Sequence, residues 1–237
     1  MAATVEESNR ELSRYAGPPG SPAAVRLLNR SRQLAETTTQ TTTTKTSAIA
    51  DPGPLGLAGF ALTTFVLSVF NSGMIKTGDG VVLGLALAYG GIAQFAAGMW
   101  EFVRGNTFAA LAFASYGGFW ISFWILIGHT DFSTAKGNDL HHGLGAYLLA
   151  WAIFTGYMIL ASMRVSGAVA AVFVALTLTF LFLALGQFTM KATEVTNGLY
   201  KFGGWLGLIT ALLAWYASFA AVTNATWKRT VLPTWPQ

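Results

Sequence analysis

The chain has 237 residues, of which 53% are hydrophobic and 14% aromatic, while only 10% are charged. Soluble domains carry about 25% charged residues, so this composition cannot cover a water-soluble fold with polar surface. The absence of cysteine excludes disulfide scaffolds and thiolate chemistry. The net charge of +4 does not indicate nucleic-acid binding, because the basic residues occupy tails and short connections. Composition therefore predicts an integral membrane protein with lipid as its surroundings.

Residues 1–50 differ from the rest of the chain. They contain six of the 14 Lys and Arg residues, three of the seven prolines and a threonine-rich tract. No apolar run among them approaches the about 20 residues that cross a bilayer. We expect a disordered cytosolic tail over 1–50, in which a short amphipathic segment over 24–35 is an alternative. The transport domain is expected over 51–226, followed by a short cytosolic tail over 227–237.

Six apolar runs of membrane-spanning length follow this tail. They cover residues 54–72, 80–103, 106–128, 142–163, 167–189 and 200–224. Between Leu55 and Leu232 there is no proline, so no helix is expected to be kinked by one. The runs lack the alternation of a transmembrane barrel. The sequence predicts an all-α bundle of six transmembrane helices.

The distribution of basic residues predicts how the bundle is oriented. If the N-terminal tail is cytosolic, all eight arginines lie on the cytosolic side, as the positive-inside rule requires. The four basic residues left on the outer side are Lys76, Lys136, Lys191 and Lys201. Both termini are therefore expected in the cytosol, with the protein in the plasma membrane.

Small residues recur at four-residue steps in two spans, as they do where membrane helices pack closely. The stripes are Ala86, Gly90, Gln94 and Gly98 in the second span, and Gly203 and Gly207 in the sixth. We interpret the glycines as packing positions. For Gln94, a structural hydrogen bond and a wet cavity are both open, because an amide within lipid needs partners.

Hydroxyl and amide side chains lie on otherwise apolar faces. Phe60 and Asn71 are 11 residues apart, close to three helical turns, and Leu176 and Gln187 repeat that spacing. Without any cation in a span, such a lining fits a small solute that is bound weakly and released quickly. The alternative is a packed bundle whose hydroxyls bond to their own backbone. The polar residues in question are Thr63, Thr64, Asn71, Gln94 and Gln187.

Other ionisable residues give weaker indications. Glu101 lies within an apolar span, three residues before Arg104, and is either an ion-pair anchor or a proton or gate site. His129, His141 and His142 fall at helix ends, where we expect surface residues rather than metal ligands. No phosphate loop, nucleophile elbow or zinc motif occurs. The sequence therefore predicts no enzyme, no metal and no cofactor.

Several motifs resemble one known family in their order along the chain. Asp51-Pro-Gly-Pro-Leu-Gly-Leu57 resembles the Asn-Pro-x-Pro-Leu-Gly-Leu signature of the acetate uptake transporter family, which includes bacterial succinate–acetate permeases and fungal acetate–ammonium transport outward proteins. The other matching blocks are Tyr89-Gly-Gly-Ile-Ala-Gln-Phe95, Glu101, Gly105-Asn-Thr-Phe108, Ser115-Tyr-Gly-Gly-Phe-Trp120 and Arg229-Thr-Val-Leu-Pro233. The resemblance covers residues 51–233.

This resemblance implies a homohexameric ring in which each subunit has its own pathway for acetate and related short carboxylates. By motif position, the family's apolar constriction corresponds to Phe60, Tyr116 and Leu176. Its threonine pair corresponds to Thr63 and Thr64, and its helix-one asparagine to Asn71. The inner-mouth motif consists of Asp51, Pro52, Pro54, Leu55, Gly56 and Leu57. Since Asp51 replaces the signature asparagine, we expect it to add negative charge near the mouth of an anion path.

The sequence leaves the transport mode open between an anion channel, proton coupling and passage of the neutral acid. Ammonium or ammonia export, which the resemblance to the fungal members of the family implies, is an alternative substrate class, and a polar, aromatic-lined pore is compatible with it. A non-transporting sensor of acetate or pH, signalling through the N-terminal tail, is an alternative of a different kind.

Overall fold

The computed structural model describes residues 21–22, 25–26, 29–30, 32–33 and 49–236. The chain divides into two units, Met1–Ala48 and Ile49–Gln237. In the first unit, the described residues between 22 and 33 are helical. The predicted disordered tail lies largely outside the described residues and stays a prediction.

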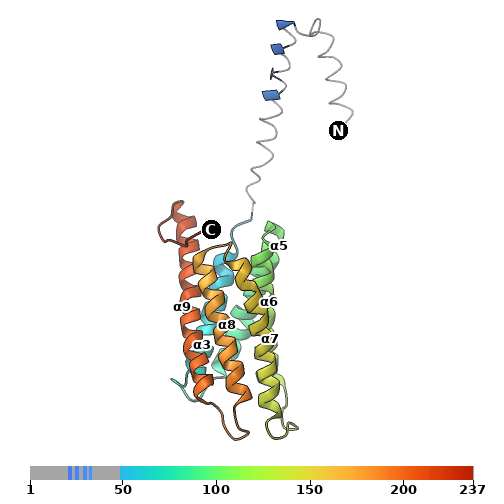
Figure 1. The fold of residues 1–237 in the computed structure, drawn as a ribbon, viewed down its shortest axis with the longest axis vertical. Helices are drawn as coiled ribbons and strands as arrows, with labels where there is room; N and C mark the ends of the chain where they lie inside the picture. Colours follow the sequence, from blue (N-terminus) through green and yellow to red (C-terminus); the bar gives the residue numbers. More distant parts are fainter. Residues whose placement is uncertain (1–20, 23–24, 27–28, 31, 34–48, 237) are drawn as a thin grey trace, which may run out of the picture. The chain divides into compact units, whose positions relative to one another are not determined.

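The second unit is a bundle of long helices (Figure 1). Their bounds are α3 Gly53–Asn71, α4 Val81–Leu87, η1 Ala88–Ala93, α5 Gln94–Arg104, α6 Thr107–His129, α7 Asp139–Ser162, α8 Gly167–Phe188 and α9 Gly198–Trp227. With α4, η1 and α5 counted together, residues 49–236 contain six segments long and apolar enough to cross a membrane. Each begins and ends within three residues of its predicted bounds, so the predicted six-helix bundle is confirmed.

Consecutive spans run in opposite directions and enclose a shared interior. Helix α9 packs against both α3 and α8, α7 packs against α8, and α5 packs against α6. Because α3 begins after Asp51 and ends at Asn71, we call the two ends of the bundle the Asp51 end and the Asn71 end. The core between the helices is aromatic and aliphatic.

The second span is not a uniform α-helix. Its middle turn, η1, is a π-helix with Gly90 and Gly91 at its centre. A side chain on Gly91 would lie 2.5 Å from the carbonyl oxygen of Ala86, so the wide turn requires glycine there. Single π turns widen a helix by one residue and occur frequently at functional sites. Here the turn lies against Thr63 of α3 and Trp120 of α6.

Helices α3 and α9 pack closely where Gly204 and Gly207 of α9 face the last turn of α3. An added Cβ on Gly204 would lie 2.2 Å from the backbone nitrogen of Ser72, and one on Gly207 would lie 2.2 Å from Ser68 Oγ. Small residues allow this approach between membrane helices. The packing interpretation of the glycines in the sixth span is therefore confirmed for Gly207.

The C-terminal residues fold back onto the start of α8. Asn224 anchors them, because its side chain accepts from the backbone nitrogens of Val231 and Leu232 at 2.7 and 3.0 Å. The carbonyl oxygen of Trp235 then accepts from Gly167 N at 2.8 Å. This contact satisfies a backbone donor that the first turn of a helix otherwise leaves unpaired.

Candidate functional site

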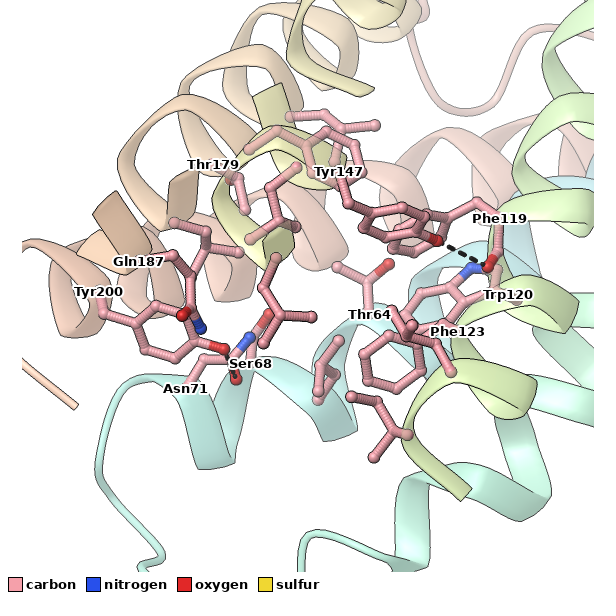
Figure 2. A pocket seen from close by; sticks show the side chains of 18 of the residues that line it. Thr64, Ser68, Asn71, Phe119, Trp120, Phe123, Tyr147, Thr179, Gln187 and Tyr200 are labelled. Atoms are coloured by element: carbon pink, nitrogen blue, oxygen red, sulfur yellow. Dashed lines mark hydrogen bonds between the residues drawn. The ribbon is translucent and has the colours of Figure 1, made fainter. Parts of the chain in front are cut away.

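The main cavity of the bundle lies between α3, α6, α7, α8 and α9 toward the Asn71 end (Figure 2). Its volume is about 90 Å³. One water needs roughly 10–15 Å³ by the same measure, so the cavity has room for a small solute. We call it the main cavity, and its polar lining consists of Thr64, Ser68, Asn71, Trp120, Tyr147, Thr179, Gln187 and Tyr200.

A smaller cavity of about 20 Å³ lies on the Asp51 side of the main cavity. Phe60 and Leu176 line both, so their side chains form the partition between the two spaces. Tyr116 lines the smaller cavity, and its ring centroid lies 5.5 Å from that of Phe60. All three side chains are buried, with 3–4% of their surface exposed. The structure therefore brings together the three residues predicted for the constriction.

Hydrogen bonds fix the orientation of Tyr116. The hydroxyl of Thr155 donates to the carbonyl oxygen of Trp151 at 2.7 Å. Tyr116 must then be the donor in its 3.0 Å bond to Thr155 Oγ1. Its phenol is thus held between α6 and α7, and its ring faces Phe60 rather than rotating freely.

The predicted threonine pair divides into two different roles. Thr63 Oγ1 donates to the carbonyl oxygen of Gly59 at 2.8 Å, so its hydroxyl is satisfied by its own helix. Thr64 Oγ1 is buried and has no hydrogen-bond partner among the described residues, and Thr64 lines the main cavity. The self-bonding alternative therefore describes Thr63, and Thr64 keeps a free hydroxyl beside the cavity.

Two further polar side chains lack partners within the described part of the chain. Both amide atoms of Gln94, which is 1% exposed, are unpaired, and Gln94 lines the smaller cavity. Trp120 Nε1 is unpaired as well and lies beside the main cavity (Figure 2). Of the two alternatives for Gln94, a structural hydrogen bond is not seen among the described residues. The alternative that remains is an amide that faces a wet cavity. Sequence reasoning missed Trp120, although it ends one of the matching motifs.

At the Asn71 end, amide, phenol and imidazole groups form a polar cluster. Tyr200 donates from its hydroxyl to Asn71 Oδ1 at 3.2 Å (Figure 2 shows the two side chains together with Gln187). His141 Nδ1 lies 2.9 Å from Gln187 Oε1, and the amide oxygen can only accept, so Nδ1 carries the proton. His129 and His142 are exposed as expected, whereas His141 is half-buried against Gln187. Tyr200 and His141 were both missed by sequence reasoning as parts of a site.

Charged residues meet at the Asp51 end. Arg104 Nη1 donates to Asp51 Oδ1 at 2.5 Å and lies 3.4 Å from Glu101 Oε2. Asp51 Oδ1 also accepts from the backbone nitrogen of Gly53 at 2.9 Å, just before α3 begins. Arg104, at the end of α5, pairs with Asp51 but is shared with Glu101, so the expected negative charge at this end stays a prediction. Glu101 is 1% exposed, so this carboxylate is buried beside a guanidinium that it shares.

The other residues of the Asp51 motif begin α3. Pro52 is its N-cap and Pro54 lies in its first turn, where a missing backbone N–H costs nothing. Gly56 allows the ring of Phe113 to approach, and Leu57 lines the smaller cavity. Leu55 is 43% exposed and lines neither cavity. Apart from Asp51, this motif therefore shapes the start of α3 rather than presenting polar groups to a solute.

Taken in order along the bundle, the lining alternates between polar and apolar zones. The amides and phenol at the Asn71 end come first, followed by Thr64 and Trp120, the Phe60–Leu176 partition, and finally Gln94. Neither cavity is lined by Lys, Arg, Asp or Glu. Within the described ranges, no group of three His, Cys, Asp or Glu side chains is arranged to hold a metal ion. The arrangement provides weak hydrogen-bond partners without a fixed charge.

Comparisons with known proteins agree with this architecture. The chain is 43% identical over 180 residues to "Ammonia transport outward protein 2" of Saccharomyces cerevisiae, with 74% of this chain and 62% of that protein covered. It is 40% identical over 194 residues to "Acetate permease A" of Emericella nidulans, covering 78% of this chain and 65% of the relative. The aligned part thus spans less than two thirds of these fungal relatives.

A solved structure shows the same fold. The chain matches the structure of the bacterial acetate channel SatP with a TM-score of 0.69 and 37% sequence identity, covering 78% of this chain and 99% of that one. Residues 34–236 match the sequence profile of the GPR1/FUN34/yaaH family. The chain is a multi-pass membrane protein that belongs to the GPR1/FUN34/yaaH family.

Proposed function

We propose that this chain transports acetate and related short-chain carboxylates through the two cavities within its own bundle. The observation that carries the proposal is the partition of Phe60 and Leu176, with unpaired polar groups on either side of it. Two relatives named for acetate, a permease and a channel, support the substrate class.

The proposed path matches the two halves of acetate. Its methyl group passes between the apolar side chains of Phe60 and Leu176, while Tyr116 lines the Asp51 side of that passage. Its carboxylate moves between donors on either side, from Thr64 and Trp120 to the amide of Gln94. Conduction requires sites that bind well enough for entry and weakly enough for release. Neutral donors meet that requirement better than a buried cation would.

The mouths of the path have different chemistry. At the Asn71 end, Gln187, Asn71 and Tyr200 line the main cavity. At the Asp51 end, Asp51, Arg104 and Glu101 form a network of one cation and two carboxylates. We assign Glu101 as the candidate proton or gate site, because it is the buried member of this network.

We also propose an assembly and a membrane orientation for the chain. Each chain forms one subunit of a homohexameric ring in the plasma membrane, with both termini in the cytosol and lipid around the ring. The positive-inside distribution of Arg and Lys supports this orientation. The Asp51 end then faces the cytosol and the Asn71 end faces outward.

Uptake of labelled acetate into proteoliposomes tests the proposal, with membrane potential and pH gradient set independently. Moving one charge across 100 mV changes the free energy by about 2.3 kcal/mol, so an anion path responds to potential. A flux that follows only the pH gradient, above the leak of acetic acid in empty liposomes, indicates proton coupling. Absence of flux under both conditions, from assembled protein, refutes acetate transport.

Ammonium or ammonia export is the second candidate, because the yeast relative is named for outward ammonia transport. The hydroxyl and amide oxygens of the lining can accept hydrogen bonds from ammonia. Competition distinguishes the two substrates: other monocarboxylates should inhibit acetate flux and leave ammonium flux unchanged.

A further inference from the structure

A second hollow lies beside the main cavity, between α6, α7 and the loop that joins them. Its volume is about 360 Å³, compared with about 90 Å³ for the main cavity. Leu126, Phe132 and Leu140 contribute to its apolar lining, and Asp139 contributes a carboxylate. We call this space the lateral vestibule.

Three side chains line both the main cavity and the lateral vestibule. They are Leu126, Leu144 and Tyr147. These residues therefore form the wall between the two spaces. Tyr147 is the largest of them and the one whose polar group is held by hydrogen bonds.

Ring stacking and hydrogen bonding to α6 hold Tyr147 in this wall, where its hydroxyl also lies 3.4 Å from the carbonyl oxygen of Phe119. Its ring stacks on Phe119, with 5.9 Å between centroids and an interplanar angle of 21°. Ser122 Oγ donates to the carbonyl oxygen of Phe119 at 2.8 Å, so Tyr147 is the donor in its 2.7 Å bond to Ser122 Oγ. The ring is thus fixed across the space between α6 and α7.

We propose that Tyr147 closes the main cavity against the lateral vestibule and so limits the alkyl-chain length of the monocarboxylates that the pathway accepts. The inference rests on the proposed function and names a residue that sets its specificity. With the ring removed, the two spaces join, and an alkyl chain can extend from the main cavity into the lateral vestibule.

The chemistry of the joined space selects one class of ligand. The unpaired groups of Thr64 and Trp120 offer hydrogen bonds to a carboxylate in the main cavity. The lateral vestibule beyond Tyr147 is apolar and suits an alkyl chain. Asp139 repels a second carboxylate there, so longer monocarboxylates are favoured over dicarboxylates.

The test compares hexanoate with acetate in Tyr147→Ala. Each buried methylene strengthens binding about fourfold, so burial of two or more raises the hexanoate-to-acetate affinity ratio by about tenfold or more. Affinity is measured by thermal stabilisation of the purified protein at increasing concentrations of each acid. The uptake ratio of the two labelled acids in proteoliposomes is the second readout.

Matched variants control the measurement. Tyr147→Phe keeps the ring, so its ratio is expected within about twofold of wild type. Tyr157→Ala removes a tyrosine of the same helix that is 55% exposed, and its ratio is expected unchanged. If Tyr147→Ala does not fold, Tyr147→Leu is measured instead, since it also opens the wall.

The outcomes separate the inference from the proposed function. An unchanged ratio in folded Tyr147→Ala, or an equal rise in Tyr147→Phe, overturns the role of the ring as a wall. An equal rise in Tyr157→Ala overturns it as well. If wild-type protein carries no carboxylate at all, the proposed function fails, whereas the stabilisation ratio still tests the wall.

Discussion

Shortening Leu176 tests the partition between the two cavities most directly. Leu176→Ala removes three carbon atoms from a side chain that is 3% exposed and lines both spaces. At about 0.8 kcal/mol per methylene, this removal costs roughly 2.4 kcal/mol of stability. Buried Leu→Ala changes range over about 2–5 kcal/mol, and a site already bordered by cavities belongs at the low end. The bundle should therefore survive the change.

The effect on selectivity should exceed the effect on folding. Removing Leu176 joins spaces of about 90 and 20 Å³ and leaves Phe60 facing an open passage. Lactate and benzoate, which are wider than acetate, should then enter. We expect their uptake relative to acetate to rise by about tenfold, equivalent to about 1.4 kcal/mol of barrier. Proteoliposome uptake of each labelled acid measures this ratio.

Leu178→Ala is the matched control for this experiment. Leu178 lies on the same helix two residues away, and 40% of its surface is exposed. Its substitution removes the same atoms without touching either cavity, so selectivity should stay at the wild-type value. An unchanged preference for acetate in folded Leu176→Ala would refute the partition, and so would an equal gain in Leu178→Ala.

Three more substitutions test other parts of the bundle. Trp120→Phe removes an unpaired buried donor and should weaken acetate affinity about tenfold in uptake assays. An affinity equal to that of wild type would show that Trp120 does not contact the solute. Glu101→Gln leaves Arg104 paired with Asp51 and should abolish the pH dependence of acetate flux; an intact pH profile assigns Glu101 to anchoring alone. Gly204→Ala places a methyl group against the backbone of α3 and should lower the free energy of unfolding by about 1–3 kcal/mol, as measured by thermal unfolding. Gly118→Ala is the control, because its added Cβ meets nothing within 4 Å and its stability should change little. Equal stability of these two glycine variants would contradict the close α3–α9 contact.

The helices could be predicted from the sequence because membrane spans depend on a local property. A run of about 20 apolar residues is visible without knowledge of its neighbours, and the charged connections mark its ends. The π turn was not predictable in the same way. A Gly-Gly pair fits an α-helix equally well, and the neighbours of η1, Thr63 and Trp120, belong to other helices.

The candidate site was predicted only in part, because polar groups in membranes acquire roles from their partners. Spacing alone pointed to Phe60 and Leu176, but the family resemblance was needed to assign them and Tyr116 to a constriction. Thr63 and Thr64 looked equivalent, but the hydroxyl of Thr63 bonds to Gly59 and that of Thr64 does not.

Contacts between distant segments were beyond the reach of sequence reasoning. The pairing of Asp51 with Arg104 was not foreseen, because Arg104 lies 53 positions later in the chain. The bond between His141 and Gln187 joins α7 to α8 in the same way. Tyr147 was not singled out either, since its place between two cavities depends on side-chain contacts between α6 and α7.

The unpaired polar atoms give the strongest physical argument that the interior serves a solute. A buried donor or acceptor without a partner costs about 1–3 kcal/mol, and nothing in lipid compensates for it. Within the described residues, such atoms belong to Thr64, Trp120 and Gln94, and each of these residues lines a cavity. A bundle built only for packing would have no reason to place them there. Their distribution on both sides of Phe60 and Leu176 is the one expected if a polar group crosses an apolar partition and needs a partner before and after it.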